Sequence, residues 1–405
     1  MRIVHVEDSF HPDAGYQINI MPKYLSQFGH DVYIVTSQLE KINNTALAFF
    51  DLSNLSEKDN TYTEKTGVKI IRIPPRINHK IIGRVVQSKE LYKTVESLNP
   101  DVIYVHGNDT FTGIRYILFN KQYPLVTDSH MLNMASINRF SVLFQKAYRS
   151  IVTPKLIKNK IPVIRTQDDS YVERCLGIPL SQAPWVSYGT DTLLFHRDIN
   201  IRHNFRTEIG ISEDNIVFIY TGKMDEAKGG KLLAKAFFKK FRGTRDVVLM
   251  VVGKIGNDEY GQEVDCLLKK SENRIIRFTT QKYSDLPKFY QSADVSIFAK
   301  QCSLSFYDAQ GCGLPVISEG NNINIDRNSH GNGLCFSPGS VEDFRIKIQS
   351  VIDMSNYELQ EMSNNAYRFI TEKYNYEDKA KEYEAIICCE YERFHSRCGL
   401  QKVDK

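Results

Sequence analysis

The chain has 405 residues, of which 42% are hydrophobic and 25% are charged. This composition excludes a disordered chain, and the length fits two domains of ordinary size. A net charge of +4 is too small for this length to indicate a nucleic-acid partner. The eight cysteines form no Cys-x-x-Cys pair and show no metal-ligand spacing, so we expect free thiols and no metal site.

In the first half, short apolar runs alternate with helix-like segments. The runs that read as strands lie at 2–6, 31–36, 67–73, 100–105 and 124–130. Apolar residues at helical spacing between 18 and 28 separate the first two, which predicts the start of a doubly wound parallel sheet. Residues 38–66 are polar with no clean period, and we expect a long surface insertion there. No charged-then-apolar leader precedes the first strand and no apolar run reaches roughly 20 residues, so we expect a cytoplasmic protein.

Polar side chains stand where the predicted strands of the first half end. Glu7 and Asp8 follow the first strand, and His106 and His130 follow two later ones. Sites in such sheets gather at this edge. Each histidine alone is equally well explained as a hydrogen-bonding loop residue, but two on successive strand ends favour a functional site.

The stretch 139–165 combines apolar residues with a run of basic ones. Its cations include Lys146, Arg149, Lys155, Lys158, Lys160 and Arg165. One interpretation is a basic amphipathic surface for anionic lipid. The other, an ordinary solvated helix face, is favoured by about two to one on the sequence alone.

The second half repeats the alternation after a polar connector at 192–214. A strand at 216–221 leads to Gly222-Lys223, and Lys228-Gly229 then precedes a helix. Glycines admit a phosphate to the backbone and two ammonium groups neutralise it, so this loop predicts a phosphate site. It is neither a Walker A loop nor a GxGxxG loop, which weakens ATPase and nicotinamide interpretations.

A loop and short helix at 300–315 lie between two further apolar runs. Small and polar residues could turn backbone N–H groups inward at Ser303, Leu304, Ser305 and Phe306. A short helix from Asp308 follows and is closed by Gly313. This is where α/β proteins hold phosphates and riboses, although one more βα turn explains the spacing equally well.

The residues Asp308-Ala-Gln-Gly-Cys-Gly-Leu-Pro-Val316 resemble the signature of glycosyltransferase family 4, whose members are retaining group 1 enzymes with the GT-B fold. The resemblance implies that Asp308 holds the ribose hydroxyls of a nucleotide sugar. Lys300 stands where the family carries an acidic residue. A cation there would suit an acidic donor sugar such as a uronic acid, unless the side chain points into solvent, which we favour.

Other landmarks of the family follow in order along nearly the whole chain. The resemblance implies that Lys223 and Lys228 clamp the donor diphosphate, with Lys223 in place of an arginine. It also implies that His130 lies beside the transferred sugar and that 188–192 is the hinge. The remaining donor-side residues are Gly222, Gly253, Thr280, Gln281 and Lys300, and the acceptor-side residues are Gly15, Tyr16 and His106.

The resemblance implies an α/β protein of GT-B fold, with two facing Rossmann-like doubly wound domains and a cleft between them. Residues 1–190 would form the acceptor-side domain, 191–375 the donor-binding domain, and 376–405 a helix that crosses back to the first. The expected reaction is retaining, metal-independent transfer from a UDP- or GDP-linked sugar, with Lys223, Lys228 and His130 as catalytic residues. The expected acceptor is a glycan or lipid-linked glycan of bacterial surface polysaccharide or glycoconjugate synthesis, reached by peripheral contact with the inner membrane.

Two other functions remain open. A nucleotide-sugar 2-epimerase shares the architecture and uses carboxylates to remove a proton. A catalytically silent partner subunit would explain Lys300, whereas Lys228, Asp308 and His130 argue for an enzyme. We expect neither a cofactor nor a bound metal, because no two aspartates have the Asp-x-Asp spacing that chelates a metal–diphosphate.

Overall fold

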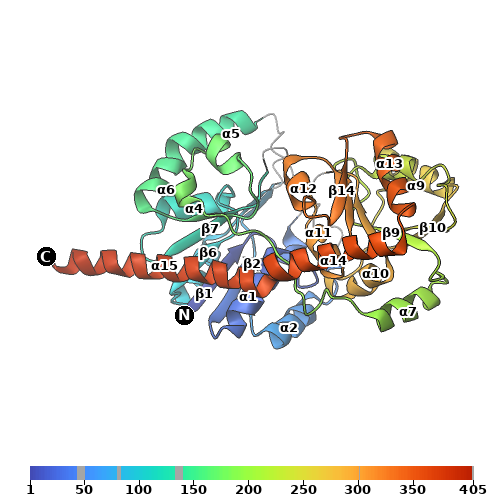
Figure 1. Cartoon of the computed structure of the whole chain (residues 1–405). Helices are drawn as coiled ribbons and strands as arrows, with labels where there is room; N and C mark the ends of the chain where they lie inside the picture. Colours follow the sequence, from blue (N-terminus) through green and yellow to red (C-terminus); the bar gives the residue numbers. More distant parts are fainter. Residues whose placement is uncertain (43–50, 80–83, 133–139, 301, 404–405) are drawn as a thin grey trace. The chain divides into compact units, whose positions relative to one another are not determined.

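The computed structural model describes residues 1–42, 51–79, 84–132, 140–300 and 302–403 (Figure 1). The chain divides into two compact units. The first unit comprises Met1–Tyr188 together with Tyr376–Lys405, and the second comprises Gly189–Asn375.

The first unit is built on a six-stranded parallel sheet of order β3-β2-β1-β6-β7-β8. Its strands are β1 (Arg2–Glu7), β2 (Asp31–Ser37), β3 (Lys69–Ile73), β6 (Val102–Val105), β7 (Leu125–Ser129) and β8 (Val163–Arg165). Its helices are α1 (Gln17–Gln27), α2 (Leu55–Thr66), α3 (Lys89–Ser97), α4 (Phe111–Phe119), α5 (Ser141–Ala147), α6 (Thr153–Asn159) and α15 (Tyr376–Val403), with a π-helical turn, η4 (Tyr148–Val152), joining α5 to α6. Strands β6 and β7 are buried along their whole length, as expected for a parallel sheet covered by helices.

The second unit repeats this plan with the order β11-β10-β9-β12-β13-β14. Its strands are β9 (Ile216–Thr221), β10 (Val247–Val252), β11 (Arg274–Phe278), β12 (Val295–Phe298), β13 (Val316–Glu319) and β14 (Gly333–Phe336). Its helices are α7 (Ile199–Glu208), α8 (Gly230–Ala236), α9 (Glu259–Lys269), α10 (Pro287–Ser292), α11 (Ser305–Gly311), α12 (Asn322–Arg327), α13 (Val341–Ile352) and α14 (Asn356–Lys373). Every residue of β9 and β10 is buried, which explains why both read as uninterrupted apolar runs.

Helix α15 belongs to the first unit, although it follows the second in sequence. The ring of Tyr376 stacks on Tyr24 of α1 with centroids 6.2 Å apart. The Tyr383 hydroxyl donates to the carbonyl of Val186 at 2.9 Å, and Glu384 accepts from His30 at 2.7 Å. These contacts fix the helix along its amino-terminal half.

Three elements depart from the expected outline. The polar stretch 38–66 was expected to be an irregular insertion, but α2 occupies its second half. A bidentate pair between Arg72 and Asp59 anchors this helix, and Gly67 ends it in the left-handed conformation at φ +75°. A two-stranded antiparallel hairpin of β4 (Ile77–His79) and β5 (Arg84–Val86) precedes α3, and α7 lies within the polar connector. Across the described residues, no helix is both long and apolar enough to cross a membrane.

Candidate functional site

The strand order reverses at the same place in both units, and this brings the predicted donor loops together. In the second unit the reversal lies between β9 and β12, so the loops after these strands flank one crevice at the carboxyl edge. A Cβ atom built on Gly229, in the loop after β9, would lie 3.0 Å from the Cβ of Lys300, which follows β12. The topology therefore places residues some 70 positions apart in contact.

Glycine is required where the loops after β9 and β10 meet. Gly222 has φ +134° and Gly253 has φ +151°, a region that side chains disfavour. A Cβ on Gly253 would lie 1.9 Å from the carbonyl oxygen of Gly222. The two backbones touch here, while the N–H groups of Gly222 and Gly253 donate to the carbonyls of Val252 and Phe278, each at 3.0 Å.

The two lysines of this loop form a pair of poorly solvated cations. Lys223 and Lys228 are both half-buried. Burial lowers the pKa of each ammonium group; Asp225 raises both, and the charge of Lys228 lowers that of Lys223 further. Two neighbouring cations whose charged forms are disfavoured are arranged to be stabilised by an anion.

Lys300 lies at the edge of the same loop. Its side chain is exposed, and its ammonium group is 3.5 Å from the carbonyl oxygen of Glu226. At that distance the hydrogen bond is weak. The side chain is therefore largely in solvent and next to the phosphate loop.

Helix α11 begins at Ser305, whereas the sequence predicted a loop at 303–306 and a helix from Asp308. Leu304 is the N-cap residue, and no side chain caps the helix there. The first N–H groups of a helix have no partner within it, so an uncapped start can donate hydrogen bonds to a bound anion. Arg327 donates to the carbonyl of Ser303 at 3.3 Å, and its guanidinium group lies over the Tyr307 ring. These two contacts hold the loop before α11 in place.

Asp308 is a buried carboxyl group on α11. Its Oδ1 atom accepts hydrogen bonds from Thr190 at 2.6 Å and Tyr283 at 3.0 Å. Burial raises its pKa to about 7, and these two hydrogen bonds lower it only in part. Both bonds reach Oδ1, so Oδ2 has no hydrogen-bond partner among the described residues.

The predicted nucleobase contacts follow β11 at the same edge of the sheet. Thr280 is exposed and Gln281 is half-buried. The Gln281 amide donates to the carbonyl of Thr279 at 2.9 Å, which holds this turn. Backbone groups of an exposed turn could pair with a base.

In the first unit, Asp128 joins the two predicted histidines. Its Oδ1 lies 3.0 Å from Nε2 of His130, and its Oδ2 lies 2.9 Å from Nδ1 of His106. Oδ1 also accepts from the backbone N–H of Gly107 at 2.7 Å. The other ring nitrogen of His106 lies 3.1 Å from Nδ1 of His5. A fully buried carboxylate thus holds an imidazole on each side.

The charges in this cluster follow from burial and from the Asp128 carboxylate. Burial favours a neutral His130, but the charge of Asp128 and the contact with Tyr188 at 2.5 Å outweigh it, and the pKa of His130 lies well above its ordinary value. Burial and the neighbouring His106 hold the pKa of His5 well below its ordinary value. Burial, followed by the charge of Asp8, raises the pKa of Glu7 to about 8. His130 is 36% exposed and can present a charged N–H to a ligand.

The other acceptor-side residues lie in different surroundings. His106 is only 3% exposed, with its ring nitrogens 2.9 Å from Asp128 and 3.1 Å from His5, so it cannot touch an acceptor without rearrangement. Gly15 is half-buried, and Tyr16 is the N-cap residue of α1 with half of its surface exposed. The loop before α1 is tied by Asn19, which donates to the carbonyl of His11 at 2.8 Å.

His106, Asp128 and His130 also form a set of potential metal ligands whose donor atoms lie within 4.8 Å of one another. Each of these atoms already faces a partner within the cluster. An ion would have to displace those contacts, so we assign no metal to the cluster.

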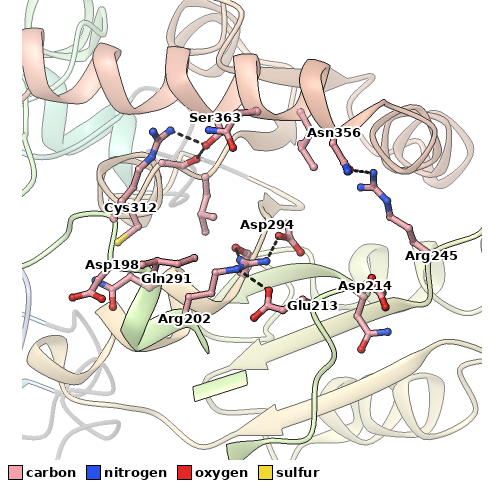
Figure 2. Close-up of a pocket in the computed structure, with 18 of the residues that line it drawn as sticks. Asp198, Arg202, Glu213, Asp214, Arg245, Gln291, Asp294, Cys312, Asn356 and Ser363 are labelled. Atoms are coloured by element: carbon pink, nitrogen blue, oxygen red, sulfur yellow. Dashed lines mark hydrogen bonds and ion pairs between the residues drawn. The ribbon is translucent and has the colours of Figure 1, made fainter. Parts of the chain in front are cut away.

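A cavity lies at the opposite, amino-terminal edge of the second sheet. It has a volume of about 810 Å³ and is lined by residues of α7, α14 and the starts of β9, β12 and β13 (Figure 2). Its cations are engaged: Arg202 pairs with Asp294 at 2.8 Å and with Glu213 at 3.2 Å, and Arg245 bonds Asn356. Ligands of doubly wound sheets bind at the other edge, and we do not include this cavity in the candidate site.

Sequence reasoning missed the residues that hold the predicted ones in place. Asp128 stands two positions before His130, and such spacing in a strand places side chains on one face, a signal that could have identified it. Thr190 and Tyr283 carried no comparable signal, because they reach Asp308 from distant parts of the chain.

Comparison with known proteins agrees with this geometry. Residues 201–369 match the family model of group 1 glycosyl transferases. A probable sucrose-phosphate synthase of Thermosipho melanesiensis is 26% identical, over 93% of this chain and 91% of that protein. Among solved structures, Anabaena HepE in complex with UDP and glucose superposes with a TM-score of 0.73 (17% identity, 96% and 100% of the two chains). A glycosyltransferase of Rickettsia africae superposes with a TM-score of 0.72, at 15% identity over 97% of this chain and 98% of that one. The family match covers most of the second unit, and the likeness to solved glycosyltransferases shows that the chain has the GT-B fold.

Proposed function

We propose that the chain is a group 1 glycosyltransferase of family 4. It moves a sugar from a nucleotide-diphosphate sugar, with retention of configuration and without a metal, to a glycan or lipid-linked acceptor. The observation that carries the proposal is the lysine pair, Lys223 and Lys228, beside the glycine backbones at the switch point of the second unit. A diphosphate would add negative charge next to two ammonium groups whose charged forms are disfavoured by burial.

Different residues of the second unit bind different parts of the donor. Lys223, Lys228 and the N–H groups at the start of α11 meet the negative charge that develops on the leaving diphosphate. The carboxyl group of Asp308 accepts from the ribose hydroxyls through Oδ2, while Thr190 and Tyr283 fix Oδ1. UDP is the favoured nucleotide, because the similar Anabaena protein was crystallised with UDP and glucose.

In the first unit, His130 is the residue that donates to a hydroxyl of the transferred sugar. Asp128 keeps it protonated and fixes its ring, and His106 steadies Asp128 from the other side. We therefore give His106 a positioning role. The acceptor side then consists of the loop with Gly15 and Tyr16.

Binding of UDP, GDP, ADP and CMP in the presence of EDTA, measured by isothermal titration calorimetry, tests the donor site. We expect UDP to bind and Lys223→Ala and Lys228→Ala each to weaken it at least tenfold. The matched control is Lys235→Ala, which removes an exposed lysine of α8 next to the same loop. Equal affinity in all four proteins would refute the clamp.

Turnover completes the test. We expect UDP release from a UDP-sugar without added metal, at a rate about 10²–10³-fold lower in either loop variant. Proton NMR of the product gives the anomeric configuration, and inversion would contradict the mechanism. Nucleotide binding without turnover of any nucleotide sugar would favour a silent partner subunit, and an epimerised free sugar would favour an epimerase.

We also place the enzyme in synthesis of a bacterial surface polysaccharide or glycoconjugate, at the cytoplasmic face of the membrane. Support comes from the family resemblance and from the basic stretch at 139–165. A lipid-linked acceptor would require such a location.

A further inference from the structure

The helical segment 141–159, formed by α5, η4 and α6, has one face in the core and one face in solvent. We call it the α5–α6 segment. Tyr148, Val152 and Leu156 recur every four residues along it and are buried in the hydrophobic core of the first unit. The opposite face is therefore directed outward, and α5 and α6 lie beyond the sheet strands β6 and β7 in Figure 1.

The outward face carries large apolar side chains. Leu143 is 69% exposed, Ile151 is 62% exposed and Val142 is 60% exposed. Ile157 continues the row at the far end. Single exposed apolar residues are common, but several along one helical face mark an interaction surface.

The charges on the α5–α6 segment have one sign. Residues 141–159 contain four lysines and arginines, Lys146, Arg149, Lys155 and Lys158, and no aspartate or glutamate. Lys146, Arg149 and Lys158 are exposed and form no ion pair with any described residue. A solvated helix face ordinarily mixes both signs, as α3 does with its lysines and glutamates.

We propose that the outward face of the α5–α6 segment is a docking surface for a bilayer that contains anionic lipid. The cations are complementary to the lipid phosphates, and the apolar row enters the boundary between headgroups and acyl chains. A polyanion such as a nucleic acid would match the charge but would leave Leu143 and Ile151 exposed to water. The inference rests on the proposed function in one respect: a lipid-linked acceptor would be located at the membrane.

Flotation of the full chain with lipid vesicles, without donor sugar, tests the surface separately from catalysis. We expect binding to phosphatidylcholine vesicles with about 30% phosphatidylglycerol at about 0.1 M salt, and none to phosphatidylcholine alone. Absence of binding to the anionic vesicles overturns the proposal, whatever the transferase assays give. Equal binding to both vesicles also overturns it.

Two variants separate the contributions of charge and apolar contact. Lys146→Gln/Arg149→Gln/Lys158→Gln should lower the vesicle affinity by about fivefold per cation. Leu143→Gln/Ile151→Gln keeps every charge and should lower it at least tenfold. All five side chains are exposed and glutamine is a good helix former, so the fold should tolerate both changes.

The matched control is Lys89→Gln/Lys93→Gln, which removes two exposed lysines of α3 in the same unit. It should bind vesicles within twofold of the wild type. A loss equal to that of the triple variant would show that net charge, not this surface, drives binding. Retained vesicle binding by Leu143→Gln/Ile151→Gln would show that charge alone drives binding and would refute insertion of the apolar row into the bilayer. UDP affinity, measured in parallel, shows whether each protein is folded and whether the donor site works.

Discussion

Substitution of Asp308 by asparagine should stabilise the second unit at neutral and alkaline pH. Burial raises the pKa of this carboxyl group from an ordinary 3.8 to about 7. A folded-state pKa above the unfolded value means that the folded chain holds the proton more tightly. Stability is therefore full below pH 3.8 and falls as the pH rises towards 7. Asparagine carries no charge and can still accept from Thr190 and Tyr283.

The size of the effect follows from the pKa difference. Each pKa unit corresponds to about 1.4 kcal/mol, so about two units between pH 5 and pH 7 amount to roughly 3 kcal/mol. For a unit of this size, that energy shifts the melting temperature by roughly 5–10 °C. We expect the variant to gain this much over the wild type between pH 5 and pH 8.

Differential scanning calorimetry of both proteins at pH 5 and pH 8 measures the difference. Asp285→Asn, which removes an exposed carboxylate of the same unit, is the control and should show no such gain. A melting difference between wild type and Asp308→Asn that stays constant across this range would refute a raised pKa at Asp308. The same variant should bind UDP about tenfold more weakly, because a charged acceptor for the ribose is lost.

Three further changes test other parts of the site. Asp128→Asn removes the charge that opposes the effect of burial on His130, so the pKa of that imidazole should fall. Nitrogen-15 NMR should show His130 losing its proton near neutral pH. An unchanged titration would contradict the pairing of His130 with Asp128. Gly253→Ala places a methyl group against backbone and should cost about 2–4 kcal/mol in urea unfolding and lower UDP affinity, whereas Gly339→Ala, with nothing within 4 Å, should cost about 1 kcal/mol. Lys300→Glu should leave the ratio of kcat/KM for UDP-glucuronate and UDP-glucose within about threefold, because the side chain is exposed; a larger change would make Lys300 a contact of the donor sugar.

The strands and the donor loops could be predicted because their signals are local. Buried parallel strands are continuous apolar runs, and β9 begins and ends where the predicted strand at 216–221 does. The approach of Gly229 to Lys300 also follows from topology, since both stand after strands that flank the point where the order reverses.

What could not be predicted depends on contacts between distant residues. Helix α2 buries only Leu55, so its sequence shows no apolar period, and it is held by pairs such as Arg72 with Asp59. The burial of His106 is decided by His5 and Asp128, which lie on neighbouring strands. A single sequence indicates where strands end, but it does not indicate which side chains bury one another at those ends.

In both units, side chains with shifted pKa values lie at the carboxyl edge of the sheet, and the stability of the fold alone does not require this. A buried ion pair such as Asp128 with His130 costs desolvation, and apolar residues of similar volume would often stabilise the fold as well. At the carboxyl edge of the first sheet, Asp128 is held ionised while Glu7, with a pKa of about 8, stays protonated. At the same edge of the second, the pKa of Lys228 is lowered and that of Asp308 is raised.

Arg206 provides the contrast at the amino edge of the second sheet. Burial lowers its pKa too, but its guanidinium donates to Asp294 at 2.7 Å, to Ser292 at 2.8 Å and to Ser212 at 3.0 Å. That network is satisfied within the protein and needs no ligand. Lys223 and Lys228 lie in the loop after β9, and Asp308 lies in the helix after β12. We expect the two cations to meet the diphosphate of a nucleotide and Asp308 to meet its ribose hydroxyls.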